Sequence, residues 1–522
     1  MMHLKELAKK VSRKYDQLVT ESQNESFIRH NKKIWADFQS DKKENEILLE
    51  ASKTASSTIS FSYLANLLAK KHKAKIKAYV VKSKKIETKI YESFNAEIFY
   101  LSFSESQLLE AQKLFNELYP NIKTKRDVED LEINGIWIGD LLYDSHLRDW
   151  LVPTIDIKDQ RFKDSLKYAL GHYIYWRDYL NSHNVKAVIV SHCVYYQYAL
   201  ILRLAIQRGI PGYQINATHV HRLNNENLRA YTEFFDFPKE FQKLTKQEQV
   251  MGIEEAKRRI ERRLSGEVGV DMHYSSQSAF VRKEIKRVLR ESPRIKILIA
   301  VHCFFDAPHP FGQNLFPDLY EWMDFLGKIS EKTDYDWYLK THPDYLPANT
   351  PILEQFLKKY PKFTQINHKT SHLQLVDDGL DFVLTVYGTV GFEYAALGIP
   401  VINASTCNPH IGYKFNIHPR TIEEYKNILL DLHNQKLEID INQVYEYYYM
   451  RFINNTDNWL FDSYVDFLKD IGGYKKQIGS ISYKKFLEQF SPARHLQILQ
   501  TLDRFVESKE YCLPKKLLTS TA

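Results

Sequence analysis

The stretch TVYGTVGFEYAALGIPV, residues 385–401, places glycines and a hydroxyl between an apolar strand and a short helix. Gly388 and Gly391 would let the backbone come close to a ligand. The helix expected from about Val390 presents unpaired N–H groups and the positive end of its dipole. Thr389 adds a hydroxyl donor at the same terminus. Together these features predict a cradle for a phosphate or diphosphate, and a turn tightened for packing alone is the alternative.

Other residues in this half of the chain follow expected strands and could contact the same ligand. They are His302, His342, Pro343 and Tyr387, which lie at or directly after the carboxyl ends of strands expected over 294–302, 335–343 and 381–386. Ligands of open parallel sheets bind beyond the carboxyl ends of the strands. We therefore expect all four at one edge of a sheet, beside the cradle. The loop after the first of these strands also carries Asp306 and His309, either of which could touch a ligand.

Candidates for a proton-accepting group lie in the N-terminal half. Asp144 and His146 form one candidate pair, and Arg148 nearby could hold an anion. His192, at the end of a strand expected over 186–192, is the other candidate. Carboxylates and imidazoles are the common general bases of enzymes, which is why these residues are selected. A hydrogen-bonded structural role or a helix cap is the alternative for each of them.

The elements that must position these residues alternate between strand and helix. Five to six βα units between 294 and 435 predict a doubly wound parallel sheet. An earlier series predicts a second parallel sheet, with strands over 74–81, 95–103, 186–192 and 210–216. Residues 1–50 are charged and periodic, which predicts helices.

The run from Glu393 to Pro400 makes the cradle more specific. It has the pattern E-x-x-x-x-G-x-P and resembles the nucleotide-binding C-terminal domain of GT-B glycosyltransferases; the matching residues are Glu393, Ala395, Ala396, Gly398, Pro400 and Val401. The resemblance implies that Glu393 accepts hydrogen bonds from the ribose hydroxyls of a nucleotide. The K-T-H-P run at 340–343 is similar to the His-Pro motif of GT-B enzymes that use CMP-activated acid sugars, which implies that His342 contacts the nucleotide phosphate.

The resemblance implies an α/β, GT-B-like fold of two Rossmann-like doubly wound parallel-sheet domains with added helices at both termini. The expected parts are a helical extension (1–50), an acceptor-side Rossmann-like domain (51–237), a helical connector (238–293), a nucleotide-sugar-binding Rossmann-like domain (294–440) and C-terminal helices that pack back across the domains (441–522). The likeness covers 294–435 well and the N-terminal half only in broad pattern.

The function implied is a metal-independent glycosyltransferase of capsule or surface-polysaccharide biosynthesis. It would move a sugar from a nucleotide-activated donor to a polysaccharide or lipid-linked glycan. A CDP-alditol phosphotransferase and a nucleotide-sugar 2-epimerase are the enzymatic alternatives. A non-catalytic sugar-binding or scaffold subunit of a capsule assembly complex is the third. No cofactor or metal ion is expected beyond the donor substrate.

Composition and charge indicate which partners and which cellular compartment to expect. A net charge of +7 over 522 residues, with scattered basic residues, argues against a nucleic-acid partner. Two basic runs, at residues 5–14 and 257–263, have helical spacing and predict solvated helix faces, with contact to an anionic membrane surface as the alternative. The first residues lack the apolar core of a signal peptide, and no uncharged apolar stretch approaches the ~18 residues of a membrane span. Four distant cysteines fit a reducing compartment. We therefore expect a cytoplasmic protein, peripheral at the inner membrane face if it meets a membrane.

Overall fold

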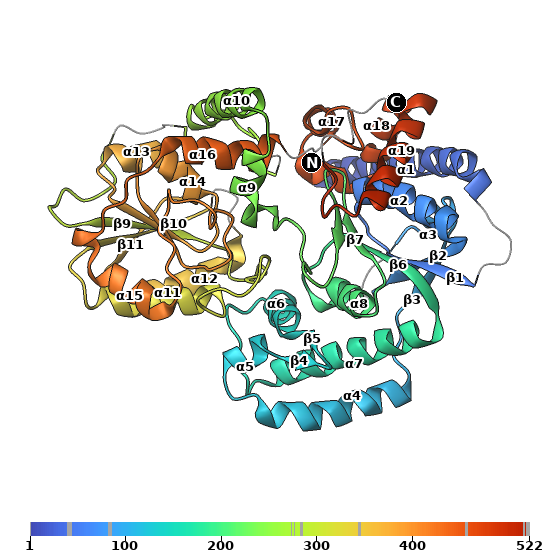
Figure 1. The fold of residues 1–522 in the computed structure, drawn as a ribbon, viewed down its shortest axis with the longest axis horizontal. Helices are drawn as coiled ribbons and strands as arrows, with labels where there is room; N and C mark the ends of the chain where they lie inside the picture. The colour runs from blue at the N-terminus through green and yellow to red at the C-terminus, as the bar shows by residue number, and fades with distance from the viewer. Residues whose placement is uncertain are drawn as a thin grey trace.

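A computed structural model describes residues 2–38, 44–81, 86–272, 274–275, 277–281, 286–342, 346–454, 458–514 and 517, without the side chains of residues 2–13 and 15. Two separate sheets organise the chain, one in each half (Figure 1). Both are wound as expected for Rossmann-like domains, so the predicted fold class is confirmed.

The N-terminal sheet has the strand order β3-β2-β1-β6-β7-β8. Its strands are β1 (Asn45–Glu50), β2 (Ala74–Val80), β3 (Ala96–Tyr100), β6 (Asn184–Val190), β7 (Gly212–Ile215) and β8 (Val220–Leu223). Neighbouring strands pair in parallel, except that β8 runs antiparallel to β7. The strand order reverses between β1 and β6, and that switch point is where an open α/β sheet binds ligands.

The C-terminal sheet is entirely parallel and has the order β11-β10-β9-β12-β13. Its strands are β9 (Lys296–Val301), β10 (Asp336–Thr341), β11 (Phe363–Ile366), β12 (Phe382–Thr385) and β13 (Val401–Asn403). Its switch point lies between β9 and β12. The sequence predicts ligand contacts from the loops after these two strands and from the end of β10 beside them.

Helices cover both sheets. Those before the C-terminal sheet are α1 (Met2–Ile34), α2 (Ala55–His72), α3 (Thr88–Glu92), α4 (Glu105–Leu118), α5 (Lys125–Glu129), α6 (Gly139–Trp150), α7 (Gln160–Ser182), α8 (Tyr196–Gln207), α9 (Phe237–Gln242) and α10 (Lys246–Leu264). The others are α11 (Leu319–Ser330), α12 (Thr350–Lys359), α13 (His372–Asp377), α14 (Val390–Ala396), α15 (Ile422–Leu430), α16 (Ile441–Tyr448), α17 (Tyr464–Ile471), α18 (Ile481–Gln489) and α19 (Pro492–Ser508). A two-stranded ribbon, β4 (Glu132–Ile133) with β5 (Ile136–Trp137), lies beside α6. In the described part of the chain, no helix has both the length and the apolar character that a bilayer crossing requires.

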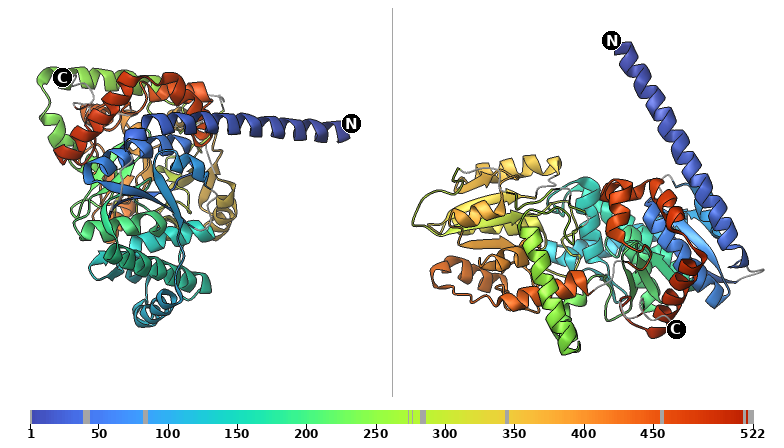
Figure 2. Two further views of the ribbon diagram at one scale, coloured as in Figure 1. Left: turned by 90° about the vertical axis from the view of Figure 1, so that its right-hand side faces the viewer. Right: turned by 90° about the horizontal axis from the view of Figure 1, so that it is seen from above.

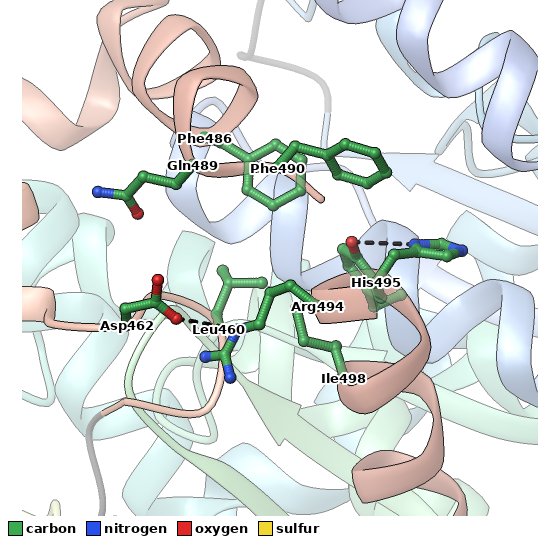
Figure 3. A pocket seen from close by; sticks show the side chains of 9 residues that line it. Leu460, Asp462, Phe486, Gln489, Phe490, Arg494, His495 and Ile498 are labelled. Carbon is green, nitrogen blue, oxygen red and sulfur yellow. Dashed lines mark hydrogen bonds and ion pairs between the residues drawn. The ribbon is translucent and has the colours of Figure 1, made fainter. Parts of the chain in front are cut away.

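The chain returns to its N-terminal half at the end. Whereas α16 packs against α10 and α14, α18 packs against α1 and α2, α19 packs against α2, and α17 packs against α18. Residues of α17–α19 share a core with the N-terminal sheet. Figure 3 shows side chains of α18 and α19 facing each other around a small cavity. Its volume of about 10 Å³ is room for about one water molecule, so it is a packing gap. Helix α1 projects well beyond the body of the molecule (Figure 2).

One expected element is wrong. Residues 45–50 lie in the region predicted to be helical, but they form β1, which pairs with both β2 and β6. Ile47 and Leu49 pack into the core on one face of the sheet, and Leu48 packs into the core on the other. A parallel strand that is buried on both faces has no polar–apolar alternation, so its sequence gives little strand signal.

Candidate functional site

His302 follows β9 and lies at the switch point of the C-terminal sheet. Its Nε2 is 3.0 Å from Thr385 Oγ1, and the backbone N–H of Val386 donates to the same nitrogen over 3.3 Å. Burial, with a smaller contribution from nearby His342, lowers the pKa of His302 to about 4. This imidazole is therefore neutral near pH 7. It ties the ends of β9 and β12 together and supplies no positive charge.

The strand, tight turn and helix from which the sequence predicts a cradle are β12, residues 386–389 and α14. Thr385 Oγ1 accepts a hydrogen bond from the N–H of Gly388 over 3.2 Å, and α14 starts two residues later at Val390. Thr389 is the N-cap residue, and its side chain makes no capping hydrogen bond. Residues 387–390 are half-buried, so the first turn of the helix remains within reach of a ligand.

The two glycines of the cradle have different roles. A Cβ at Gly388 would lie 2.8 Å from Thr385 Oγ1 and 3.4 Å from His302 Cε1, so the tight turn itself needs glycine there. A Cβ at Gly391 would lie 2.4 Å from the ring of His410, which is fully buried. Gly391 is thus explained by packing inside the domain, which was the alternative to close approach by a ligand.

We expect Gly391→Ala to lower the free energy of unfolding by about 1–3 kcal/mol, because overpacking a buried ring forces it from its position. Urea unfolding of the purified variant measures this loss. Full stability combined with weakened ligand binding would contradict the packing role and return Gly391 to the ligand site.

Glu393 is buried in α14 and faces a cation that the sequence did not assign to the site. Arg263, in the last turn of α10, forms a short ion pair with Glu393 Oε1 and also donates to it through Nε over 3.0 Å. Both contacts involve Oε1, so Oε2 is the oxygen that could accept from a ligand. Arg263 belongs to the basic run 257–263. The helical spacing of that run predicts a solvated helix face, and nothing in the sequence indicates the contact with Glu393.

A second cation lies close to Glu393. Lys340, at the end of β10, is buried, and its Nζ is 3.4 Å from Nε2 of His372. The other nitrogen of His372 is 2.5 Å from the hydroxyl of Tyr394. Burial lowers the pKa of Lys340 to about 8, although Glu393 acts in the opposite direction. Two basic side chains around one carboxylate leave this edge of the sheet suited to an anion.

The predicted pair of Asp144 and His146 does not form. Asp144 is 1% exposed and bonds to His309, whose Nδ1 is 2.6 Å from its Oδ1. His146 is also buried, and its Nδ1 is 2.9 Å from Ser165 Oγ on α7. Although they are two residues apart on α6, their side chains have different partners. Neither is open to a substrate in this structure.

His309 is part of a docking contact between the two halves of the chain. It sits between Asp144 and Glu129, whose Oε1 is 3.2 Å from its Nε2. Asp318, at the start of α11, accepts hydrogen bonds from Tyr143 over 2.5 Å and from Thr154 over 2.6 Å. The segment between β9 and α11 is therefore anchored on the N-terminal half, and this fixes how the two sheets face each other.

This docking contact predicts a pH dependence. Burial alone would lower the pKa of His309, but Asp144 and Glu129 raise it to about 10 from an ordinary 6.5. Because the folded-state pKa is the higher one, the stabilisation from the His309 imidazolium is lost as the pH rises from about 6.5 to about 10. We expect the melting temperature of the wild type to fall across this range. The double variant His309→Gln/Asp144→Asn should show a much flatter profile, and an equal slope in both proteins would exclude the imidazolium as the cause.

The carboxyl ends of the two sheets meet through Tyr195 and Asp306. Tyr195 precedes α8, has φ 65°, and donates from its hydroxyl to Asp306 Oδ1 over 3.4 Å. A bulky residue in the left-handed region is strained, and such strain is frequent at functional sites. Tyr387 donates to the carbonyl of Ala307 over 3.1 Å, and Arg148 is exposed and acts electrostatically on Tyr195. The sequence contains no pattern that singles out Tyr195.

His192 lies at the switch point of the N-terminal sheet, directly after β6, and is exposed. Its Nδ1 is 2.8 Å from Ser191 Oγ, which donates to Glu50 Oε2 over 2.6 Å. Since the hydroxyl proton of Ser191 goes to the carboxylate, Oγ can only accept from His192 Nδ1–H. The proton is thereby placed on Nδ1, and Nε2 is the basic nitrogen.

The structure describes one of the two residues of the predicted His-Pro motif. His342 is exposed at the end of β10 and close enough to contribute to the low pKa of His302. Pro343 lies outside the described residues.

Comparisons with known proteins give distant likenesses only. No protein-family model matches the sequence, and no curated protein matches it. Among solved structures, the chain is similar to the β-Kdo 2,4-transferase KpsC of Thermosulfurimonas dismutans, at 13% identity and a TM-score of 0.30 over 51% of this chain and 79% of that one. At these values the likeness assigns no activity.

Two further structures cover more of the chain at similar identity. The UDP-GlcNAc 2-epimerase of Neisseria meningitidis, bound to UDP-GlcNAc, matches at 11% identity and a TM-score of 0.21 over 77% of this chain and 97% of that one. The ADP-heptose LPS heptosyltransferase II of E. coli matches at 11% identity and a TM-score of 0.22 over 75% of this chain and 100% of that one.

Proposed function

We propose that this protein is a glycosyltransferase that moves a sugar from a nucleotide-activated donor to a glycan acceptor. The observation that carries this proposal is the meeting of two switch points. The carboxyl ends of both doubly wound sheets face each other at the Tyr195–Asp306 contact, and the buried cluster of Glu393, Arg263 and Lys340 lies on the C-terminal side. A reaction between two bound substrates needs this geometry, with one subsite from each domain.

The donor nucleotide would lie on the C-terminal domain. Glu393 would accept the ribose hydroxyls through Oε2 while Oε1 stays paired with Arg263. The phosphate would face the N–H groups of the cradle at Thr389 and Val390, with the ammonium of Lys340 and the exposed His342 nearby. Fixed donors of this kind stabilise the charge that grows on a departing phosphate without a metal ion. The K-T-H-P motif makes CMP-activated acid sugars the first donors to test.

In the transfer step, an acceptor hydroxyl oxygen bonds to the anomeric carbon of the donor sugar. The bond from that carbon to the phosphate oxygen breaks, and the nucleotide leaves with the bonding electron pair. The proton of the acceptor hydroxyl passes to Nε2 of His192. Ser191 and Glu50 support this choice because they hold the imidazole in the tautomer that is protonated on Nδ1. Its Nε2 is then unprotonated and can accept the proton. A basic N-terminal helix would bring the protein to a lipid-linked acceptor at an anionic membrane face.

The test is release of the nucleotide from CMP-, UDP- and GDP-sugars by the purified protein, with and without a mixture of glycan acceptors, followed by chromatography. A transferase releases nucleotide much faster when its acceptor is present and forms a larger glycan. An epimerase releases UDP and an altered free sugar without any acceptor. No release from any donor under either condition would contradict the proposal and favour a scaffold role.

A further inference from the structure

A ligand-sized cavity lies at the switch point of the N-terminal sheet and reaches the nucleotide cluster, because its lining residue Tyr274 interacts electrostatically with Arg263 and Glu393. Its volume is about 560 Å³, within the usual range of ligand pockets. Residues that follow β1, β6 and β7 form its floor, among them Thr54, His192 and Asn216. The opposite wall comes from the returning C-terminal segment, including Arg451 and Lys475.

The lining of this cavity is unusually rich in hydroxyl and amide groups. One of them, Gln214, is 4% exposed; its side chain hydrogen-bonds to Tyr231, and among the described residues its Oε1 has no hydrogen-bond partner. A buried amide oxygen without a donor is costly, so its presence here points to a ligand that donates a hydrogen bond. Tyr231 and Asp271 also line the cavity in left-handed conformations, with φ 63° and 54°. Sugar hydroxyls are the donors that suit such a surface.

The charges around the cavity favour an anion. Asp271 is already neutralised, because Arg259 donates to its Oδ1 over 2.7 Å and Tyr448 to its Oδ2 over 2.8 Å. Among the described residues, the side chain of Arg451 donates one long hydrogen bond, over 3.4 Å to the carbonyl of Tyr231. Within the described ranges, no carboxylate lies at ion-pair distance from Arg451 or Lys475. Glu233, which acts on Arg451 from further away, is paired with His221 over 2.6 Å.

Arg451 is part of the cavity wall, and the helix that carries it is irregular at this residue. Residues Tyr449–Ile453 form a π-helical turn that extends α16. Such turns interrupt the regular hydrogen-bond ladder and occur frequently at functional sites. The mouth of the cavity also has two largely exposed aromatic rings, Tyr274 and Tyr474, whose centroids are 6.3 Å apart.

We propose that this cavity binds an acidic saccharide, with Arg451 and Lys475 facing its anionic group and Gln214 accepting from a sugar hydroxyl. Because His192 lines the same cavity, the bound saccharide would be the acceptor of the transfer reaction. This assignment to the acceptor rests on the function proposed above, whereas saccharide binding by itself does not. The acceptor class is then a glycan that carries carboxylate or phosphate groups.

The test is calorimetric titration of the full chain, without any nucleotide, with trigalacturonic acid, galactose 6-phosphate, neutral maltotriose and inorganic phosphate. We expect at least one acidic saccharide to bind about tenfold more tightly than maltotriose and than inorganic phosphate. The first two probes distinguish a carboxylate ligand from a phosphorylated one. Equal affinity for maltotriose, affinity for phosphate alone, or no binding of either acidic saccharide would overturn the proposal.

Variants locate the site. Lys475→Gln should weaken the acidic saccharide about threefold and Arg451→Gln about tenfold, because each removes a charge-assisted contact. The matched control is Lys476→Gln, which removes the same charge from the next residue, also exposed but outside the lining. It should leave affinity unchanged, and an equal loss in Lys475→Gln and Lys476→Gln would overturn the assignment. CMP and UDP affinities of the same variants separate this proposal from the proposed function, since the nucleotide cluster uses none of these residues.

Discussion

His192→Gln is expected to lower kcat by about 10³-fold, while nucleotide affinity and the melting temperature stay close to those of the wild type. General-base catalysis contributes roughly 10²–10⁴-fold to such reactions, and glutamine cannot accept a proton at neutral pH. The side chain is exposed and follows β6, so its replacement disturbs little packing. Steady-state kinetics with the donor identified by nucleotide release measure the effect.

Two further variants make this result specific to the base. Glu50→Gln should shift the pH profile of kcat, because the amide no longer fixes the Ser191 hydroxyl and the proton on His192 Nδ1. His146→Gln is the matched histidine control: its imidazole bonds to Ser165 inside the domain, so it should lower stability without changing kcat per folded molecule. A large loss of kcat in His146→Gln and none in His192→Gln would reverse the assignment.

Glu393→Ala is expected to lower the free energy of unfolding by about 3 kcal/mol, because it leaves the mostly buried guanidinium of Arg263 without its carboxylate. It should also weaken nucleotide binding by about 1.5–3 kcal/mol if the carboxylate accepts ribose hydroxyls. Urea unfolding measures the first effect, and calorimetry on the folded variant measures the second.

The two effects of Glu393 can be separated. Replacing both partners, in Arg263→Met/Glu393→Ala, should cost less stability than the sum of the single variants, since no buried charge is left unpaired. The double variant should still bind nucleotide poorly. Normal nucleotide affinity in the double variant would confine Glu393 to a structural ion pair.

The fold could be predicted where each element has its own local signal. The C-terminal strands and helices alternate with clear apolar runs and breaks, and both parallel sheets were expected on that basis. In contrast, β1 is buried on both faces and contains two glutamates, so nothing in NEILLE distinguishes it from the charged helical region before it. The antiparallel strand β8 was also missed, since its pairing with β7 depends on a turn that the sequence does not mark.

The site could be predicted only along strand ends. The sequence predicts that His302, residues 387–391 and His192 lie at the carboxyl ends of strands, and the structure has them there, at the two switch points. The sequence could not reveal Arg263 beside Glu393, or His309 beside Asp144, because these contacts join segments 130 and 165 residues apart. Asp144 and His146 are close in sequence on α6 and were predicted to act as a pair. In the folded chain Asp144 bonds to His309 and His146 to Ser165. The C-terminal segment that returns to the N-terminal half likewise forms one wall of the cavity beside His192, and no local sequence pattern predicts this wall.

The most direct measurement is a thermal-shift comparison of the wild type and Glu393→Gln with CMP, CDP, UDP and GDP, with and without Mg²⁺. A ligand present at 100 times its dissociation constant adds about 2.7 kcal/mol of stability, which is readily detected. We expect one of these nucleotides to stabilise the wild type without metal, with selectivity for CMP if the donor is an acid sugar, and to give a much smaller shift in Glu393→Gln. No shift of the wild type with any nucleotide, or an equal shift in both proteins, would contradict nucleotide binding at this site.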